Sequence, residues 1–135
     1  MDYNNEIGNW IKNYSKELYN EDYKLCVDLT YKYPIKSEKS SRKWIKNLKT
    51  YLNNKKVFID GIVVYELDKN VQNIHNLLVY SDVKDWKSKS LIFNYWKNIG
   101  SVNIVKYNEI ENYSNYIFKY INKTKNNDWD FLINI

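Results

Sequence analysis

The sequence predicts an α+β fold of the ferredoxin-like, split β-α-β type, an antiparallel sheet with helices on its faces. In several segments apolar residues recur every three or four positions, as they do in amphipathic helices. The shorter segments between them are rich in β-branched and aromatic residues, which is typical of strands. The elements follow one another as helix, strand, helix, strand, strand, helix, strand, helix. The chain has 135 residues with no repeat and no linker-like stretch, so residues 1–135 are predicted to form one domain.

The first three elements are predicted from residues 4–53. A helix is expected over 4–20, where one stripe is apolar: Ile7, Trp10, Ile11, Tyr14 and Leu18. Residues 23–31 alternate as a strand does, and the strand should end near Pro34, which has no N–H to donate. Ser37 is a candidate N-cap for a helix over 38–53. The buried side of this helix is predicted to hold Trp44, Ile45, Leu48, Tyr51 and Leu52.

The central part of the chain predicts an antiparallel hairpin. Residues 57–67 and 72–81 read as its two strands, and residues 68–70 are turn-forming. Gly61 lies inside the first strand, where a glycine often marks a bulge.

The last elements follow the hairpin. A helix is expected from Asp82 or Asp85 to about residue 98, ending at Gly100, and a short strand over 102–107. Asn108 can cap a further helix, whose core side would hold Ile110, Tyr113, Ile117 and Ile121. The tail over 128–135 has a tryptophan and apolar residues and is expected to pack back on the domain.

Composition narrows the possible functions. The net charge is +5 and the pI is about 9.1, which favours a polyanionic partner. The chain has no alanine and one arginine, so an AT-rich genome accounts for part of its lysine and tyrosine content. One cysteine, Cys26, excludes an internal disulfide and a cysteine-based zinc site. With no apolar run of the roughly 18 residues that a membrane span needs, and no signal peptide, we expect a cytoplasmic protein without a membrane partner.

The stretch over 116–123 carries the strongest chemical signal. Tyr116 and Tyr120 stand four residues apart on a predicted helix, as do Lys119 and Lys123. Side chains at this spacing are neighbours, so both phenols could reach one phosphate. A tyrosine hydroxyl can act as a covalent nucleophile when the developing charge is stabilised. The chain has 14 tyrosines, however, and Tyr19 and Tyr23 form another pair with this spacing.

This octapeptide resembles the third motif of rolling-circle replication initiators, the Rep proteins of the HUH endonuclease superfamily, which reads Tyr-x-x-Lys-Tyr-x-x-Lys. Three other stretches resemble Rep motifs in the expected order: residues 26–31, Glu66 with residues 73–79, and residues 96–102. The resemblance implies an HUH Rep nuclease-like domain from a virus or plasmid. Such a protein nicks and rejoins single-stranded or hairpin origin DNA through a 5′-phosphotyrosine. The catalytic residues would be Tyr116, Tyr120 and Lys119. No P-loop is present, so any helicase would be a separate protein.

The expected metal strand departs from the family pattern. HUH proteins carry two histidines two residues apart, whereas this chain has a single histidine, His75. A gapless alignment from Glu66 places Ile74 and Asn76 at the two histidine positions, and a shift by one residue makes His75 a ligand beside Asn73. The resemblance therefore implies Mn²⁺ or Mg²⁺ bound by Glu66 with either His75 or an asparagine carbonyl such as that of Asn76. Alternatively the metal site is lost, and the chain is a catalytically inactive DNA-binding relative.

Basic residues supply the candidate DNA contacts. Lys123 lies beside the tyrosines, and Arg42, Lys43 and Lys46 cluster on the helix predicted over 38–53. A solvated helix face explains the second cluster equally well. In a third interpretation, the tyrosines only fill the core of a binding module unrelated to nucleic acid.

Overall fold

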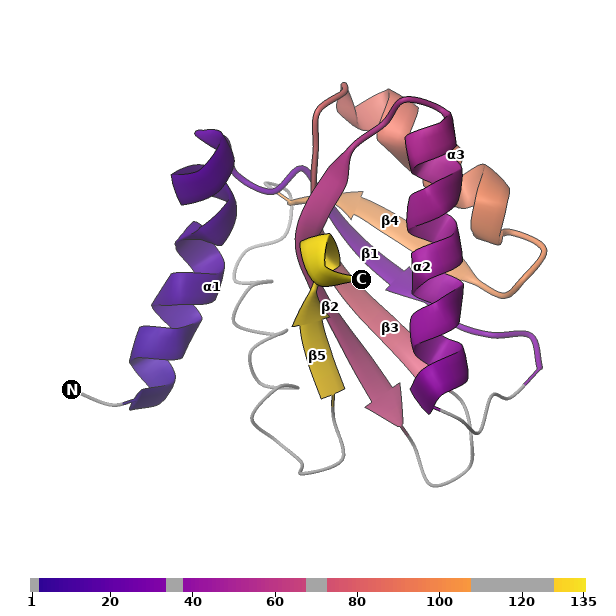
Figure 1. The fold of residues 1–135 in the computed structure, drawn as a ribbon, viewed down its shortest axis with the longest axis horizontal. Coiled ribbons are helices and arrows are strands. Elements are labelled where there is room, and N and C mark those ends of the chain that lie inside the picture. The colour runs from indigo at the N-terminus through magenta and orange to yellow at the C-terminus, as the bar shows by residue number, and fades with distance from the viewer. Residues whose placement is uncertain (1–2, 34–37, 68–72, 108–127) are drawn as a thin grey trace.

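The computed structural model describes residues 3–33, 38–67, 73–107 and 128–135, which form an α+β fold (Figure 1). Helices and strands follow in the order α1 (Tyr3–Tyr19), β1 (Leu25–Leu29), α2 (Glu38–Asn54), β2 (Ile59–Leu67), β3 (Asn73–Ser81), α3 (Asp85–Trp96), β4 (Val102–Lys106) and β5 (Asp128–Phe131). A short 3₁₀ helix, Leu132–Asn134, follows β5. The three helices and the first four strands match the predicted elements. The helix predicted after Asn108 lies outside the described residues.

The five strands form one sheet in the order β4-β1-β3-β2-β5, and all neighbours are antiparallel. β1 and β2 are parallel to each other, are joined through α2 and have β3 between them. β3 and β4 are likewise joined through α3 and have β1 between them. This interleaving is the predicted split β-α-β connectivity. β5 extends the sheet beyond β2, so the tail packs on the domain as expected.

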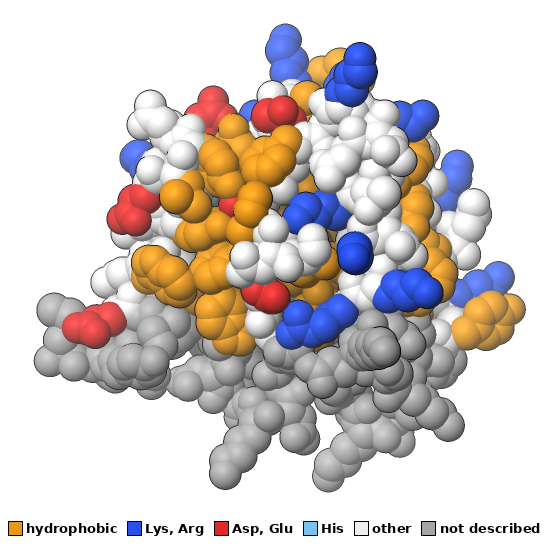
Figure 2. Space-filling view, in the orientation of Figure 1, with side chains coloured by type: hydrophobic (Ala, Val, Ile, Leu, Met, Phe, Trp, Pro, Cys, Tyr) orange, Lys and Arg blue, Asp and Glu red, His pale blue; other side chains and the backbone are white. Residues whose placement is uncertain are grey.

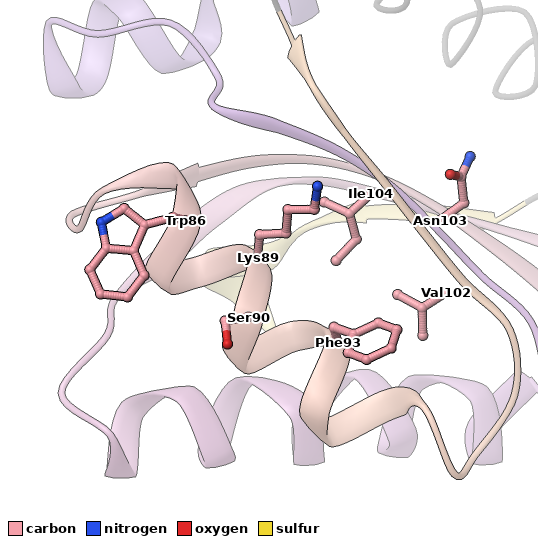
Figure 3. Close-up of a pocket in the computed structure, with 7 residues that line it drawn as sticks. All are labelled: Trp86, Lys89, Ser90, Phe93, Val102, Asn103 and Ile104. Atoms are coloured by element: carbon pink, nitrogen blue, oxygen red, sulfur yellow. The ribbon is translucent and has the colours of Figure 1, made fainter.

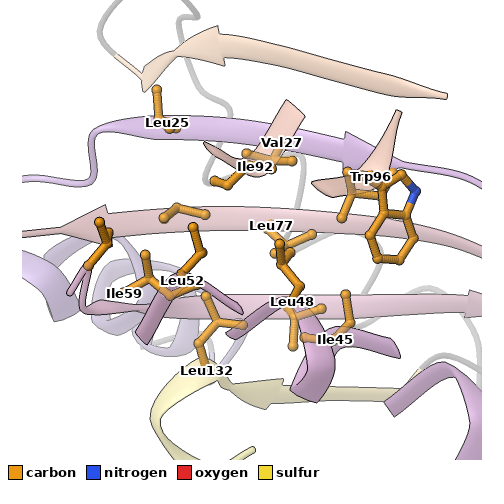
Figure 4. Packing of buried hydrophobic residues seen from close by; sticks show 14 of the residues in the cluster. Leu25, Val27, Ile45, Leu48, Leu52, Ile59, Leu77, Ile92, Trp96 and Leu132 are labelled. Atoms are coloured by element: carbon orange, nitrogen blue, oxygen red, sulfur yellow. The ribbon is translucent and has the colours of Figure 1, made fainter. Parts of the chain in front are cut away.

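The two faces of the sheet are covered by different helices. α2 and α3 cover one face, here called the α2–α3 face, over a core that includes Leu25, Val27, Leu29, Leu48, Leu77, Ile92, Trp96 and Leu132 (Figure 4). The opposite face, here called the α1 face, is packed by Ile11 and Tyr14 of α1 over Cys26, Ile62, Val64 and Leu78. Alternate residues of each strand point to opposite faces, so strand parity assigns each residue to a face. Within the described residues, no helix is long and apolar enough to span a membrane.

Gly61 sits in β2 without a bulge. The pairing of β2 with β3 runs unbroken from Ile59 opposite Ser81 to Leu67 opposite Asn73. The bulge expected at this glycine is therefore wrong. Gly61 instead adopts a φ of 138°, a conformation that residues with a Cβ rarely reach.

A buried carboxylate joins α1 and the C-terminal tail to the sheet. Asp60 is fully buried in β2, and its Oδ2 accepts hydrogen bonds from the hydroxyls of Tyr14 (2.8 Å) and Tyr19. Its Oδ1 accepts from the backbone N–H groups of Gly61 (2.7 Å) and Ile133 (3.0 Å). Four donors therefore compensate the cost of burying this carboxylate.

Candidate functional site

Three polar side chains share the α1 face near one end of the sheet. Strand parity places Glu66 of β2 on this face with Ile62 and Val64. Asn76 of β3 lies on the same face, directly opposite Val64 on one side and Asp28 of β1 on the other. Glu66 pairs with the residue two before Asn76, so it is a diagonal neighbour of Asn76. Three neighbouring strands thus each contribute one polar residue to a row on this face: Asp28, Asn76 and Glu66.

Asn76 is the buried member of this row. Its side chain is 2% exposed, whereas Glu66 and Asp28 are partly buried. Among the described residues, the Asn76 Nδ2 has no hydrogen-bond partner. The same is true of the His75 Nδ1 and the Tyr65 hydroxyl on the other face of the sheet, but only the Asn76 amide lies in a row with two acidic residues. Buried amides are normally paired because an unsatisfied one costs roughly 1–3 kcal/mol.

His75 lies on the opposite side of the sheet from this row. It is fully buried on the α2–α3 face, and its Nε2 is 2.6 Å from the Tyr31 hydroxyl. Its ring packs edge-on against those of Tyr31, Tyr65 and Trp96, with centroids 5.0–6.2 Å away. A metal ligand here could not reach an ion held by Glu66, so the expectation that these two residues share a cation is wrong. The alternation instead matches the gapless alignment, in which Asn76 stands beside Glu66.

Burial also keeps the imidazole uncharged. Desolvation lowers the His75 pKa from its ordinary value of 6.5 to about 3. The neutral ring can hydrogen bond to Tyr31, whose own pKa burial raises. His75 is therefore a structural core residue.

The buried imidazole makes stability dependent on pH. Because the pKa of His75 is about 3 in the folded chain and near 6.5 when unfolded, only the unfolded chain binds the proton between these values. The free energy of unfolding is therefore expected to fall as the pH drops from about 6.5 toward 3, with His75 contributing on the order of 4 kcal/mol. Urea denaturation at stepped pH values measures this, with His75→Phe as the non-titrating comparison. Parallel pH profiles for the two proteins would contradict it.

The oxygen atoms in this row are of the type that a hard cation binds, but the row offers few of them. Glu66 and Asp28 offer carboxylate oxygens and Asn76 an amide oxygen, the donors that Mg²⁺ and Mn²⁺ accept. In the part of the chain that the structure describes, no cluster of three or more His, Cys, Asp or Glu side chains could hold a metal ion. A cation here would need water or substrate oxygens to complete its shell.

Asp28 was not among the predicted site residues. Its signal was present in the sequence, because an acidic residue interrupts the apolar strand Leu25–Leu29 at one position of the two-residue period. Burial and, secondly, the Asp28 carboxylate raise the pKa of the Cys26 thiol to about 12. The lone cysteine is thus a buried residue whose thiol stays protonated near neutral pH.

The tyrosines expected to carry the chemistry, Tyr116 and Tyr120, lie outside the described residues, as do Lys119 and Lys123. The other tyrosine pair with this spacing, Tyr19 and Tyr23, makes hydrogen bonds within the fold. The Tyr19 hydroxyl donates to Asp60 and the Tyr23 hydroxyl to the backbone oxygen of Ile11. Burial is the first cause that raises both of their pKa values. This pair is therefore unsuited to nucleophilic attack.

The basic residues of α2 differ in their surroundings. Arg42 donates to the Asp130 carboxylate at 3.3 Å, and its guanidinium lies 5.1 Å from the centre of the Tyr65 ring. Lys43 and Lys46 are exposed. In Figure 2 most basic side chains gather on the side of α2, and acidic ones lie mainly on the side of α1. Because α2 covers the α2–α3 face, Lys43 and Lys46 are separated by the sheet from Glu66 and Asn76.

In comparisons with protein-family models, curated proteins and solved structures, nothing matched this chain.

Proposed function

We propose that this protein is a Rep-type enzyme that nicks and rejoins single-stranded or hairpin DNA through a 5′-phosphotyrosine. The octapeptide at 116–123, with Tyr116, Lys119, Tyr120 and Lys123, carries the proposal. The split β-α-β sheet supports it, because it puts the motif residues Glu66 and Asn76 side by side on one face. The remaining motifs occur in the family's order.

The proposed reaction is a phosphoryl transfer. The hydroxyl oxygen of Tyr116 or Tyr120 attacks the scissile phosphorus, the phenol proton is lost, and the bond from phosphorus to the 3′ oxygen breaks. The leaving strand takes a proton to end in a 3′-hydroxyl, and attack by a 3′-hydroxyl in the reverse sense rejoins DNA and frees the tyrosine. Lys119 would favour the phenolate, and Lys123 would hold the phosphate. Mn²⁺ or Mg²⁺ bound by Glu66, Asn76 and Asp28 would polarise the phosphate.

An adduct assay tests the proposal. Labelled single strands and hairpins incubated with the protein and Mn²⁺ are expected to give a covalent protein–DNA band that survives denaturation. Tyr116→Phe with Tyr120→Phe should abolish the band, because both candidate nucleophiles are removed. Tyr33→Phe is the matched control, since the Tyr33 side chain is 75% exposed and should leave the band unchanged. Absence of a band with every strand and metal would refute catalysis.

A second candidate is a catalytically inactive relative that binds DNA. The burial of the single histidine on the α2–α3 face favours it, since no imidazole then remains for a metal site of the family type. Salt-sensitive DNA binding without an adduct would identify this function.

A further inference from the structure

A groove lies between α3, which covers the α2–α3 face, and β4, whose lining residue Asn103 pairs with Asp28 of the neighbouring strand. Its volume is about 470 Å³. Its walls include Trp86, Lys89, Ser90 and Phe93 of α3, with Val102 and Ile104 of β4 (Figure 3). β4 is an edge strand, so the groove runs along the margin of the sheet.

Two aromatic rings are exposed along this groove. Trp86 is 68% exposed and Phe93 is 48% exposed. They are seven residues apart, two helical turns, so they share one side of α3 about 10 Å apart along its axis. The helix attaches to the sheet through its buried residues Ser88, Ile92 and Trp96. Most of the Trp86 surface is therefore not used in folding.

Lysines accompany the two rings. Lys89 lies between them in sequence, and its side chain extends over the groove toward Ile104 (Figure 3). Residues 84–106 contain five lysines against one aspartate, Asp85. Lys84, Lys87, Lys89 and Lys97 are exposed. The groove therefore lies in a basic surface.

A second, polar hollow adjoins the groove at the end of α3. It measures about 580 Å³ and is lined in part by Lys32, Lys97, Asn98, Thr30 and Ser101. The Ser101 N–H donates to the Thr30 Oγ1 at 3.1 Å, which fixes the hydroxyls at its rim. Lys97 follows Phe93 by one helical turn, and Ser101 precedes Val102, so lining residues of the two hollows are neighbours in the chain. The groove and this second hollow are together called the track.

We infer that this track binds single-stranded nucleic acid, with bases stacked on Trp86 and Phe93 and phosphates held by Lys89 and Lys97. Exposed aromatic rings combined with a basic groove are the two features by which proteins hold single strands without reading sequence. A duplex would present its phosphates but not the faces of its bases. A second copy of the same basic surface would be repelled, and so the charge favours a polyanion.

That the bound strand is also the strand that is nicked rests on the proposed function. Binding itself does not require cleavage. It is tested by fluorescence anisotropy with a labelled DNA strand, the RNA of the same sequence and the DNA duplex. The variant Trp86→Ala with Phe93→Ala removes both stacking surfaces. The control, Leu18→Ala with Ile133→Ala, removes two other exposed apolar side chains, which are 58% and 47% exposed.

The wild-type protein should bind one or both single strands more tightly than the duplex. The aromatic variant should bind them at least about tenfold more weakly, and the control variant unchanged. Lys89→Ala should make the slope of log affinity against log salt concentration shallower by about one, the value for one lost phosphate contact. Lys16→Ala on α1 should leave this slope unchanged. If the aromatic variant does not fold, Lys89→Glu with Lys97→Glu tests the same track through exposed residues.

Equal affinities of wild-type and aromatic variant, or preference for duplex, would overturn the inference. So would a wild-type dimer, seen by sedimentation, that the aromatic variant loses without any change in oligonucleotide binding. If the aromatic variant forms the adduct and also binds oligonucleotides as well as the wild type does, this inference is overturned and the proposed nicking stands. Track-dependent binding without an adduct would overturn only the proposed nicking.

Discussion

Replacing Gly61 with alanine is expected to destabilise the domain by more than about 3 kcal/mol, enough to unfold a marginal protein. A Cβ at this position would lie 1.8 Å from the backbone oxygen of Leu78 on β3. That oxygen belongs to the strand backbone, so relief would require β2 and β3 to separate. The φ of 138° adds conformational strain, because residues with a Cβ rarely adopt it.

Urea denaturation of Gly61→Ala measures this loss. Gly8→Ala is the matched control, since Gly8 lies within α1 and alanine is favoured there by about 0.5–1 kcal/mol over glycine. The two substitutions add the same methyl group and should act in opposite directions. A Gly61→Ala protein as stable as the wild type would show that β2 does not pass this close to β3.

Replacing Asp60 with alanine is expected to cost about 4 kcal/mol or more. The substitution leaves the Tyr14 and Tyr19 hydroxyls and the N–H groups of Gly61 and Ile133 without their acceptor. Each unsatisfied buried donor costs roughly 1–3 kcal/mol, reduced where water can enter. The loss should loosen both α1 and the C-terminal tail, because one carboxylate joins them to β2.

Asp60→Asn separates charge from hydrogen bonding. The asparagine oxygen can still accept from the two N–H groups, and its amide can donate to the tyrosine oxygens. Its cost should be about half that of Asp60→Ala. Hydrogen exchange should show the increased exposure in α1 and in residues 131–135. Equal, small effects of both substitutions would contradict the anchoring role of the carboxylate.

The sequence by itself determined most of the secondary structure and its order. The helix predicted over 38–53 is α2 (Glu38–Asn54), and the hairpin predicted over 57–81 is β2 with β3. These segments are long, and their apolar periods are clear, so local preference and burial agree. β5 was predicted only as a packed tail, because four residues with two aspartates carry little strand signal. It becomes a strand because the edge of β2 offers hydrogen bonds.

Only the tertiary structure decided which residues share a site. Around His75 both faces of β3 are apolar, so periodicity could not show which way the imidazole pointed. A shift of one residue reverses every side chain of a strand, and the pairing with β1 and β2 removes that ambiguity. Pairing puts His75 into the core with Tyr31 and places Asn76 between Asp28 and Glu66. The physical reason is that the face on which a side chain lies is set by pairing between strands. Those strands are distant from one another in the chain.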